Sequence, residues 1–355
     1  MATLSEAYTE TPLLLEHIIP IDFDSFKEVP QSHSWPRSGD ESPRRMLNFE
    51  GDHFSVPAID LESPDAIEMV GHACKNLGIF QVTRHGIPSS LLREVESQAW
   101  QFFSLPARAK VRAARSPGGA TGYGVARITP FFNKFMWHEG FTMMGSPLEH
   151  AREVWPHGYR KFCKVMEDYQ DKMKALSERL LAMILKYLGI SEHDIDWPRL
   201  RSNPSSALQL NSYPQCPDPG LAMGLAPHTD TSFLTILHQN DSAHGLQFHR
   251  EGRGWVPVLP MDGALVVNVG DMLHIMSNAM FPSVVHRVIA NGKRHRLSIG
   301  YFYRPPMDFR IGPIHGLTQA SGQEVAARFQ SIMVKDYVQM KAKNLDKALS
   351  MIRIG

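Results

Sequence analysis

Three residues of this chain, His228, Asp230 and His286, are of the types that together hold one metal ion. Two imidazoles and one carboxylate bind one face of a non-haem Fe(II) and leave the opposite face open. His228 and Asp230 are two positions apart, so in an extended strand both side chains point to the same side. His286 lies in a later β-branched run. This set therefore predicts an iron centre carried on strands.

Each of these residues has a plainer interpretation when it is taken alone. The chain has 17 histidines, so one His-x-Asp triplet is expected by chance. A single histidine is more often a surface residue or a hydrogen-bonded core residue than a ligand. A zinc hydrolase would use a similar ligand set, but the chain lacks a His-Glu-x-x-His helix. The combined spacing favours iron.

A second group of residues predicts a carboxylate-binding site. Arg296 follows His286 by ten positions, and its guanidinium could hold a carboxylate through two parallel hydrogen bonds. Ser298 shares the face of the same predicted strand and adds a hydroxyl donor. Asn211 and Tyr213 close another predicted strand, and we include both in this site. The alternative for Arg296 is a solvated basic strand over residues 293–296.

The elements that must position these residues change in character along the chain. Residues 1–52 are rich in proline, serine and charge, which predicts a flexible N-terminal arm. Residues 53–200 form a predicted helical region, residues 201–308 a β core, and residues 309–355 a C-terminal helical segment. Apolar runs between turn signals in the β core are typical of an antiparallel sandwich or barrel. All candidate ligands lie in this core.

Individual elements of the first two regions follow from periodicity. We predict an edge strand over 56–60, a strand over 79–83, and helices over 66–76, 89–103 and 162–187. Ser89 is the predicted N-cap of its helix, and glycines predict a loop over 115–124. In the β core we predict strands over 208–210, 233–237, 246–248, 255–258, 264–269, 284–289 and 297–303. A closing helix is expected over 325–341.

Composition excludes several classes of protein. The 355 residues include 43% hydrophobic and 21% charged residues, so the chain can bury a large core. A net charge of +1 gives no reason to expect nucleic acid or an anionic membrane as partner. The three scattered cysteines argue against a disulfide framework and favour a reducing compartment. We therefore expect a cytoplasmic protein, without a membrane span or signal peptide, that functions as a monomer.

These motifs resemble the 2-oxoglutarate- and Fe(II)-dependent dioxygenases of plants, from about Val56 to near the C-terminus. The resemblance extends to residues 78–86, 102–106 and 268–271, the last of which we interpret as a turn supporting the site. It implies a mainly β protein with flanking helices, built on a double-stranded β-helix (jelly-roll) core. It further implies Fe(II) on His228, Asp230 and His286, and 2-oxoglutarate on Arg296 and Ser298 with help from Tyr213. Dioxygen as oxidant and ascorbate as activator follow from the same resemblance.

Within that family the chain is most similar to gibberellin 3β-hydroxylases. The stretches that carry this similarity are residues 122–128, 131–142, 224–230 and 347–353, and the match is less close at 248–250 and 303–306. The implied reaction is 2-oxoglutarate-dependent hydroxylation of a gibberellin at carbon 3, which yields succinate and CO2. The alternatives are an oxidase of gibberellin position 2 or 20, a dioxygenase of another plant molecule such as a flavonoid, and a non-catalytic binding barrel.

A gibberellin is a rigid, largely apolar diterpenoid acid, so its pocket should be apolar with a few placed polar groups. Arg127 or Lys134 is expected to meet the substrate carboxylate, and we prefer Arg127 because it follows the glycine-rich loop. The expected pocket walls are aromatic side chains of the same region: Tyr123, Phe131, Phe132, Trp137 and Phe141.

Overall fold

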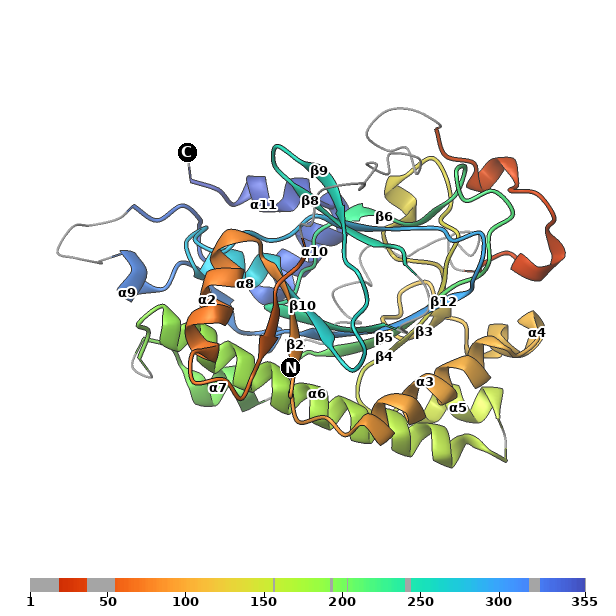
Figure 1. The fold of residues 1–355 in the computed structure, drawn as a ribbon, viewed down its shortest axis with the longest axis horizontal. Coiled ribbons are helices and arrows are strands. Elements are labelled where there is room, and N and C mark those ends of the chain that lie inside the picture. The colour runs from red at the N-terminus through yellow and green to blue at the C-terminus, as the bar shows by residue number, and fades with distance from the viewer. Residues whose placement is uncertain are drawn as a thin grey trace.

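Two mainly antiparallel sheets face each other at the centre of the protein (Figure 1), and the one parallel pair among the described strands of the larger sheet is β1 with β2. The computed structural model describes residues 19–36, 55–155, 157–191, 194–202, 204–239, 244–318 and 326–354. The larger sheet has the strand order β1-β2-β10-β7-β12-β5-β4-β3, and the smaller has the order β6-β11-β8-β9. The strands are β1 Ala58–Asp60, β2 Ile79–Thr83, β3 Gly122–Gly124, β4 Glu139–Met143, β5 Ala207–Tyr213, β6 Met223–His228, β7 Leu234–Gln239, β8 Leu246–Arg250, β9 Gly254–Pro257, β10 Leu265–Val269, β11 His286–Ile289 and β12 Arg296–Tyr303, with a separate pair of β13 Arg310–Ile311 and β14 Ile332–Met333.

The chain passes back and forth between the two sheets from β5 to β12. Strands β5, β7, β10 and β12 belong to the larger sheet, and β6, β8, β9 and β11 belong to the smaller one. This winding is a double-stranded β-helix, so the predicted fold class is confirmed. The predicted strands recur here, and β6, which carries His228, is an additional one.

Strands from the first half of the chain extend the larger sheet. Val82 of β2 pairs with Leu265 of β10, and Phe141 of β4 pairs with Leu210 of β5. Residues 53–200 and 201–308 therefore share one sheet. The change in composition near residue 200 therefore does not coincide with a break between sheets.

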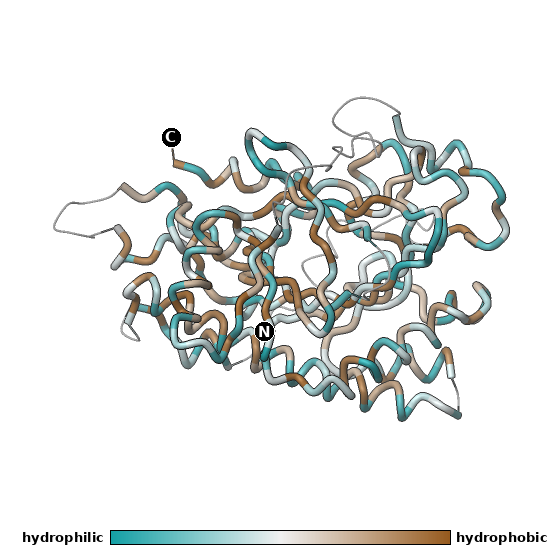
Figure 2. The backbone as a smooth tube through the Cα atoms, in the orientation of Figure 1, coloured by the Kyte–Doolittle hydropathy of each residue, from teal (hydrophilic) through white to brown (hydrophobic). Residues whose placement is uncertain are grey.

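Helices cover the outer face of the larger sheet, and the longest, α6, runs along it (Figure 1). Its apolar stripe is buried, including Met166, Tyr169, Met173 and Leu180, and belongs to the main hydrophobic core. Hydrophobic segments gather toward the centre of the molecule (Figure 2). The helices are α2 Ala66–Asn76, α3 Ser89–Phe103, α4 Ala107–Lys110, α5 Leu148–Val154, α6 Tyr159–Tyr187, α7 Trp197–Ser202, α8 Asp271–Met276, α9 His315–Thr318, α10 Val334–Asn344 and α11 Lys347–Met351, with 3-10 turns at Phe23–Ser25, Gln31–His33, Val111–Ala113 and Thr129–Phe131.

Most element boundaries agree with the sequence pattern, and the exceptions have local causes. Helix α3 begins at Ser89, but its N-cap is Pro88 and no side chain caps it. The predicted loop over 115–124 contains the short strand β3, which pairs with β4. The closing helix α10 begins at Val334, because β14 occupies the two preceding residues. Residues 319–325, including the start that we predicted for this helix, lie outside the described residues.

Part of the N-terminal arm packs tightly on the domain, so the predicted flexibility is wrong for residues 19–36. Trp35 is 3% exposed, and its indole N–H donates to the carbonyl of Phe135 at 2.9 Å. Phe23 lies edge-on against Trp137, with ring centroids 4.8 Å apart. Apolar burial therefore holds this segment although its composition resembles a linker. Residues 1–18 and 37–54 lie outside the described residues.

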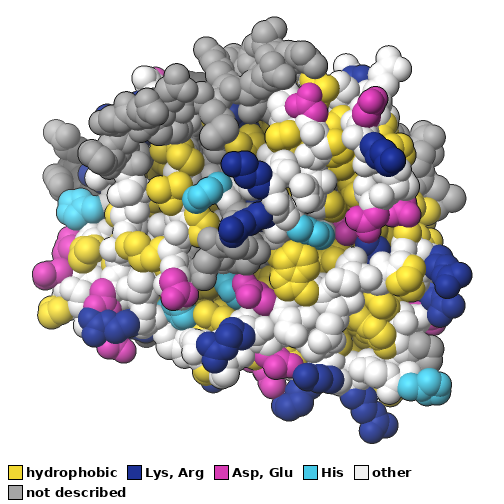
Figure 3. Space-filling model, turned by 45° about the vertical axis from the view of Figure 1, so that its right-hand side comes forward, with side chains coloured by type: hydrophobic (Ala, Val, Ile, Leu, Met, Phe, Trp, Pro, Cys, Tyr) yellow, Lys and Arg dark blue, Asp and Glu magenta, His cyan; other side chains and the backbone are white. Residues whose placement is uncertain are grey.

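The surface agrees with the charge balance of the chain. On the face in Figure 3, acidic and basic side chains alternate with hydrophobic ones. Cys74, Cys163 and Cys216 are all buried and free. None of the helices that the structure describes has the length and apolar character required to cross a bilayer.

Candidate active site

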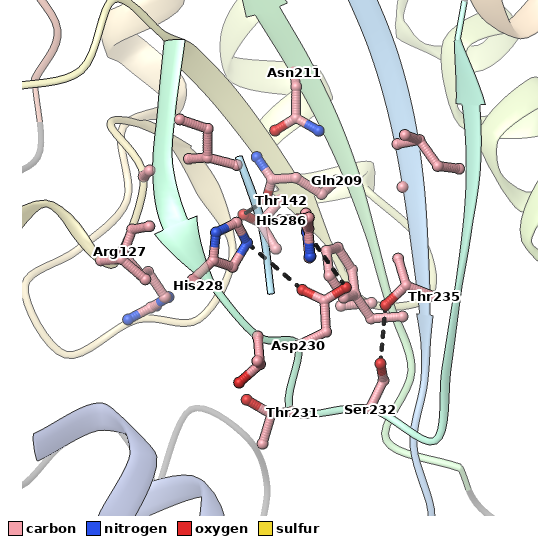
Figure 4. A pocket seen from close by; sticks show the side chains of 18 of the residues that line it. Arg127, Thr142, Gln209, Asn211, His228, Asp230, Thr231, Ser232, Thr235 and His286 are labelled. Atoms are coloured by element: carbon pink, nitrogen blue, oxygen red, sulfur yellow. Dashed lines mark hydrogen bonds and ion pairs between the residues drawn. The ribbon is translucent and has the colours of Figure 1, made fainter. Parts of the chain in front are cut away.

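His228, Asp230 and His286 meet at one end of the smaller sheet (Figure 4). The Nε2 atom of His228 lies 3.7 Å from Oδ1 of Asp230, and Nε2 of His286 lies 3.8 Å from Oδ2. One ligand atom from each residue lies within 4.8 Å of the others, and all three residues are buried. Strand β6 ends at His228, so Asp230 reaches the same point from the following loop and not from the strand that we expected.

Backbone carbonyls fix the orientation of both imidazoles. Nδ1 of His228 lies 2.8 Å from the carbonyl of Ala226, and Nδ1 of His286 lies 3.2 Å from that of Val284. Such bonds place the ring proton on Nδ1 and aim the Nε2 lone pair at a metal. Burial and, to a smaller extent, the neighbouring His286 together lower the pKa of His228 to about 4. At neutral pH this imidazole is uncharged and able to coordinate.

The donor set fits Fe(II). Oδ2 of Asp230 is buried and has no hydrogen-bond partner, which is costly for a carboxylate unless a cation takes that place. Two imidazole nitrogens and one carboxylate on a single face leave the remaining positions open, as in non-haem iron oxygenases.

Beside this cluster, Arg296 is buried at the start of β12. Its guanidinium donates to Oγ of Ser298 at 3.2 Å and to Oε1 of Gln239 at 3.0 Å. It also stacks on the ring of Tyr213 at 5.1 Å from the centroid. A cation that is 1% exposed and lines a cavity is suited to hold a carboxylate.

The other three predicted cosubstrate residues surround Arg296. Cross-strand pairing places Tyr213 opposite Arg296 and Asn211 opposite Ser298, and all of them line the cavity. Burial raises the pKa of Tyr213, so its phenol remains a donor at neutral pH. The structure therefore brings together all four residues of this predicted site.

The sequence analysis did not identify two further residues that lie close to Arg296 and Asn211. Gln239 accepts from Arg296, and His138 contacts Oδ1 of Asn211 at 3.0 Å through Nε2. Burial lowers the pKa of His138 to about 4, so its imidazole is neutral. Gln239 ends β7, which neighbours β12, and His138 directly precedes β4, which neighbours β5. Their proximity depends on strand register, which no local sequence signal reports.

A cavity of about 260 Å³ connects the histidine cluster with Arg296. Its apolar lining comes from both sheets and from the segment before β4: Ile128, Phe131, Leu225, Leu237, Leu246, Val288 and Phe302. Arg127 also lines it, and its guanidinium donates to the carbonyl of Gly119. Arg127 and Phe131 are thus placed where the sequence analysis expected them.

The other predicted substrate residues are not among those that line the cavity. Tyr123 and Phe141 face the helices, where Tyr123 donates to Glu139 at 2.5 Å and Phe141 packs on Phe102. Trp137 is fully buried and donates to the carbonyl of Pro214. These aromatics are core residues, and their assignment as pocket walls is wrong.

Phe132 and Lys134 also contact the N-terminal arm. Phe132 packs on Trp35 with ring centroids 5.5 Å apart, and Lys134 donates to the carbonyl of Gln31 at 2.8 Å. Of the two residues considered for the substrate carboxylate, Arg127, which the sequence analysis preferred, lines the cavity, and Lys134 does not.

Two family models match the chain. The model of the 2OG-Fe(II) oxygenase superfamily matches residues 204–305, which contain all three clustered ligands and Arg296. The model described as the N-terminal region of a non-haem dioxygenase in morphine synthesis matches residues 56–161. Residues 162–203 lie between the two matches.

Curated relatives are similar over their full length. The chain is 47% identical to gibberellin 3-beta-dioxygenase 1 of Pisum sativum, covering 100% of this chain and 94% of that protein. It is 44% identical to gibberellin 3-beta-dioxygenase 1 of Arabidopsis thaliana, covering 99% and 98%. A crystal structure of JOX2 in complex with 2OG, Fe and JA superposes with a TM-score of 0.75 at 26% identity, covering 100% of this chain and 98% of that one.

Proposed function

This chain belongs to the 2OG-Fe(II) oxygenase superfamily, in the group of the gibberellin 3-beta-dioxygenases, and we propose that it hydroxylates a gibberellin at carbon 3 on the β face. The observation that carries the proposal is the cavity in which the His228–Asp230–His286 cluster adjoins the buried Arg296. Full-length similarity to gibberellin enzymes supports the choice of substrate.

The side chains of the cavity have different roles in this reaction. Fe(II) would be held by His228, Asp230 and His286. The bound iron would supply the oxidising chemistry, in which dioxygen drives both the oxidative decarboxylation of 2-oxoglutarate and the hydroxylation of a C–H bond. Arg296 and Ser298 bind the distal carboxylate of 2-oxoglutarate, assisted by Tyr213 and Asn211. The apolar lining excludes water and orients the substrate, so that one C–H bond faces the metal.

Arg127 is the proposed partner of the substrate carboxylate. It lies on the segment before β4 and lines the same cavity as His228 (Figure 4). An arginine offers a fixed pair of donors that matches a carboxylate. Leu225, Val288 and Phe131 provide apolar surface for the ring system of a diterpenoid.

Three further assignments complete the proposal. Dioxygen is the oxidant and ascorbate the activator that keeps the iron reduced. The protein functions as a monomer in the cytoplasm, where its three buried thiols would stay reduced. Neither nucleic acid nor a membrane is proposed as a partner.

The deciding experiment is aerobic turnover of the purified protein with Fe(II), ascorbate, 2-oxoglutarate and a gibberellin that lacks a 3-hydroxyl. We expect a 3β-hydroxylated product, identified by mass spectrometry against standards, that forms only when 2-oxoglutarate is present. A product hydroxylated at another carbon would assign the chain to a different gibberellin oxidation. Succinate release without any gibberellin product would retain the oxygenase chemistry and reject the substrate.

A further inference from the structure

A buried lysine joins helix α10 to the segment that carries His228 and Asp230. Lys341 of α10 is 7% exposed, although lysine is rarely buried without a charged partner. Its ammonium donates to Oγ1 of Thr229 at 2.5 Å, to Oδ2 of Asp271 at 2.8 Å and to Oδ1 of Asp346 at 3.3 Å. All three donor positions of the ammonium are therefore used.

Asp271 connects this lysine to both ligand-bearing segments. Its backbone N–H donates to the carbonyl of Asp230 at 2.8 Å. Its carboxylate accepts from Ser283, three residues before His286, at 2.7 Å, and from Tyr337 of α10 at 2.8 Å. Asp271 is fully buried, so these partners replace water around its carboxylate, and Lys341 is the cation among them.

The corner between α10 and α11 also contacts the loop that carries Thr229 and Asp230. Leu345, the residue directly after α10, has a φ of +47° and lies in the left-handed region, where a branched side chain is strained. Directly after it, Asp346 accepts from both the N–H and the hydroxyl of Thr229 at 3.3 Å. Lys341 and Leu345 also line the cavity. The corner thus contributes to the active site.

We propose that Lys341 is a positioning residue of the iron centre: it bridges Thr229, Asp271 and Asp346, and holds the His228–Asp230 segment in the geometry that binds Fe(II). A role in folding alone would require only the pairing of Lys341 with Asp271. The additional bond to Thr229, which lies between two of the ligands, gives the lysine direct control of their spacing. Partners one shell beyond the ligands commonly tune metal affinity. The inference concerns the iron site and does not depend on the identity of the substrate.

Thr229→Val is the primary test, because it keeps the side-chain shape, removes the hydroxyl and leaves the Lys341–Asp271 pair in place. Lys341→Met removes the ammonium and keeps most of the apolar stem. The matched control is Lys335→Met, the same change at an exposed position of α10. Fe(II) is titrated anaerobically into full-length protein with saturating 2-oxoglutarate, and the charge-transfer absorption of the Fe(II)–2-oxoglutarate complex is followed. The thermal midpoint of the metal-free protein is measured in parallel.

We expect Thr229→Val to raise the dissociation constant for Fe(II) by about 10- to 100-fold, and the thermal midpoint of the metal-free protein to stay unchanged. Lys341→Met should weaken Fe(II) binding at least as much, and Lys335→Met should not change it. Wild-type Fe(II) affinity in Thr229→Val would overturn the proposal, even if Lys341→Met is unstable or does not fold. These readouts need no gibberellin, so failure of the proposed substrate leaves the test intact.

Discussion

His228 and His286 are directly paired across the antiparallel ladder of β6 and β11, with their ring centroids 4.3 Å apart. The first is the last residue of its strand, and the second is the first residue of its own. Two histidines far apart in the chain are therefore held by one pair of neighbouring strands. This pairing makes the spacing of the two ligands a property of the sheet, and Asp230 alone reaches the metal from a loop.

Removal of one ligand should abolish the reaction while leaving the fold intact. We expect His228→Ala to lose both succinate release and hydroxylated product, because two ligands hold Fe(II) poorly. The control is His249→Ala, an exposed histidine on β8 that should react like the wild type. Succinate release and product are measured together. Wild-type product from His228→Ala would mean that this cluster is not the iron site.

The cosubstrate site makes a separate prediction about charge geometry. Arg296→Lys keeps the positive charge but loses the planar fork that contacts Ser298 and Gln239. We expect the KM for 2-oxoglutarate to rise by about tenfold or more, equivalent to about 1.4 kcal/mol. Arg294→Lys, an exposed neighbour, serves as control. An unchanged KM in Arg296→Lys would place the distal carboxylate elsewhere.

The three residues that cluster in the structure could be proposed from the sequence because their signal is local. A His-x-Asp triplet, a later histidine on a β-branched run and an Arg-x-Ser pair can each be read from neighbouring residues. The contributions of Gln239 and His138 could not be read in this way. Gln239 lies opposite Ser298 only through the register of β7 and β12, and register is a tertiary property.

The pocket walls were assigned to the wrong face for a related reason. Side chains of β4 alternate, so Thr142 faces the cavity and Phe141 faces the helices. The face covered by helices is the apolar one, and the inner face carries polar residues around the metal. We assumed that aromatic residues mark the pocket, whereas at Tyr123 and Phe141 they mark the core beneath α3. A strand pattern alone does not reveal which face is covered.

Substrate recognition should depend on Arg127. We expect Arg127→Ala to raise the KM for the gibberellin acid by about tenfold, with little change in the KM for 2-oxoglutarate. The methyl ester of the same gibberellin should distinguish the wild type from Arg127→Ala much less, because it lacks the carboxylate. Equal kinetic constants for the acid in both proteins would refute the assignment. Lys134→Ala is the comparison, since that side chain contacts the arm.

Buried neutral histidines predict lower stability in mild acid. Burial lowers the pKa of His138 to about 4, against an ordinary value of 6.5. Between these values the unfolded chain binds a proton that the folded protein excludes, so the free energy of unfolding falls as the pH falls. The slope is about 1.4 kcal/mol per pH unit for one such histidine. Urea unfolding of metal-free protein at pH 7 and pH 5 measures it. His138→Gln should reduce this slope, whereas His244→Gln, at an exposed position, should not. An equal slope in the wild type and both variants would contradict this account.

The N-terminal segment should be part of the folded unit that supports the cavity. Trp35 packs on Met136, Met223 and Ala226, in a cluster that also contacts the cavity residues Leu225 and Ile128. We expect Trp35→Ala to lower the free energy of unfolding by about 3–5 kcal/mol, because it leaves a large gap in this cluster. It should also raise the KM for the gibberellin, since one wall loses its support, while Fe(II) and 2-oxoglutarate still bind. Phe26→Ala removes an exposed aromatic from the same segment and should change neither quantity. If Trp35→Ala unfolds at the wild-type urea concentration, the segment does not contribute to stability in solution.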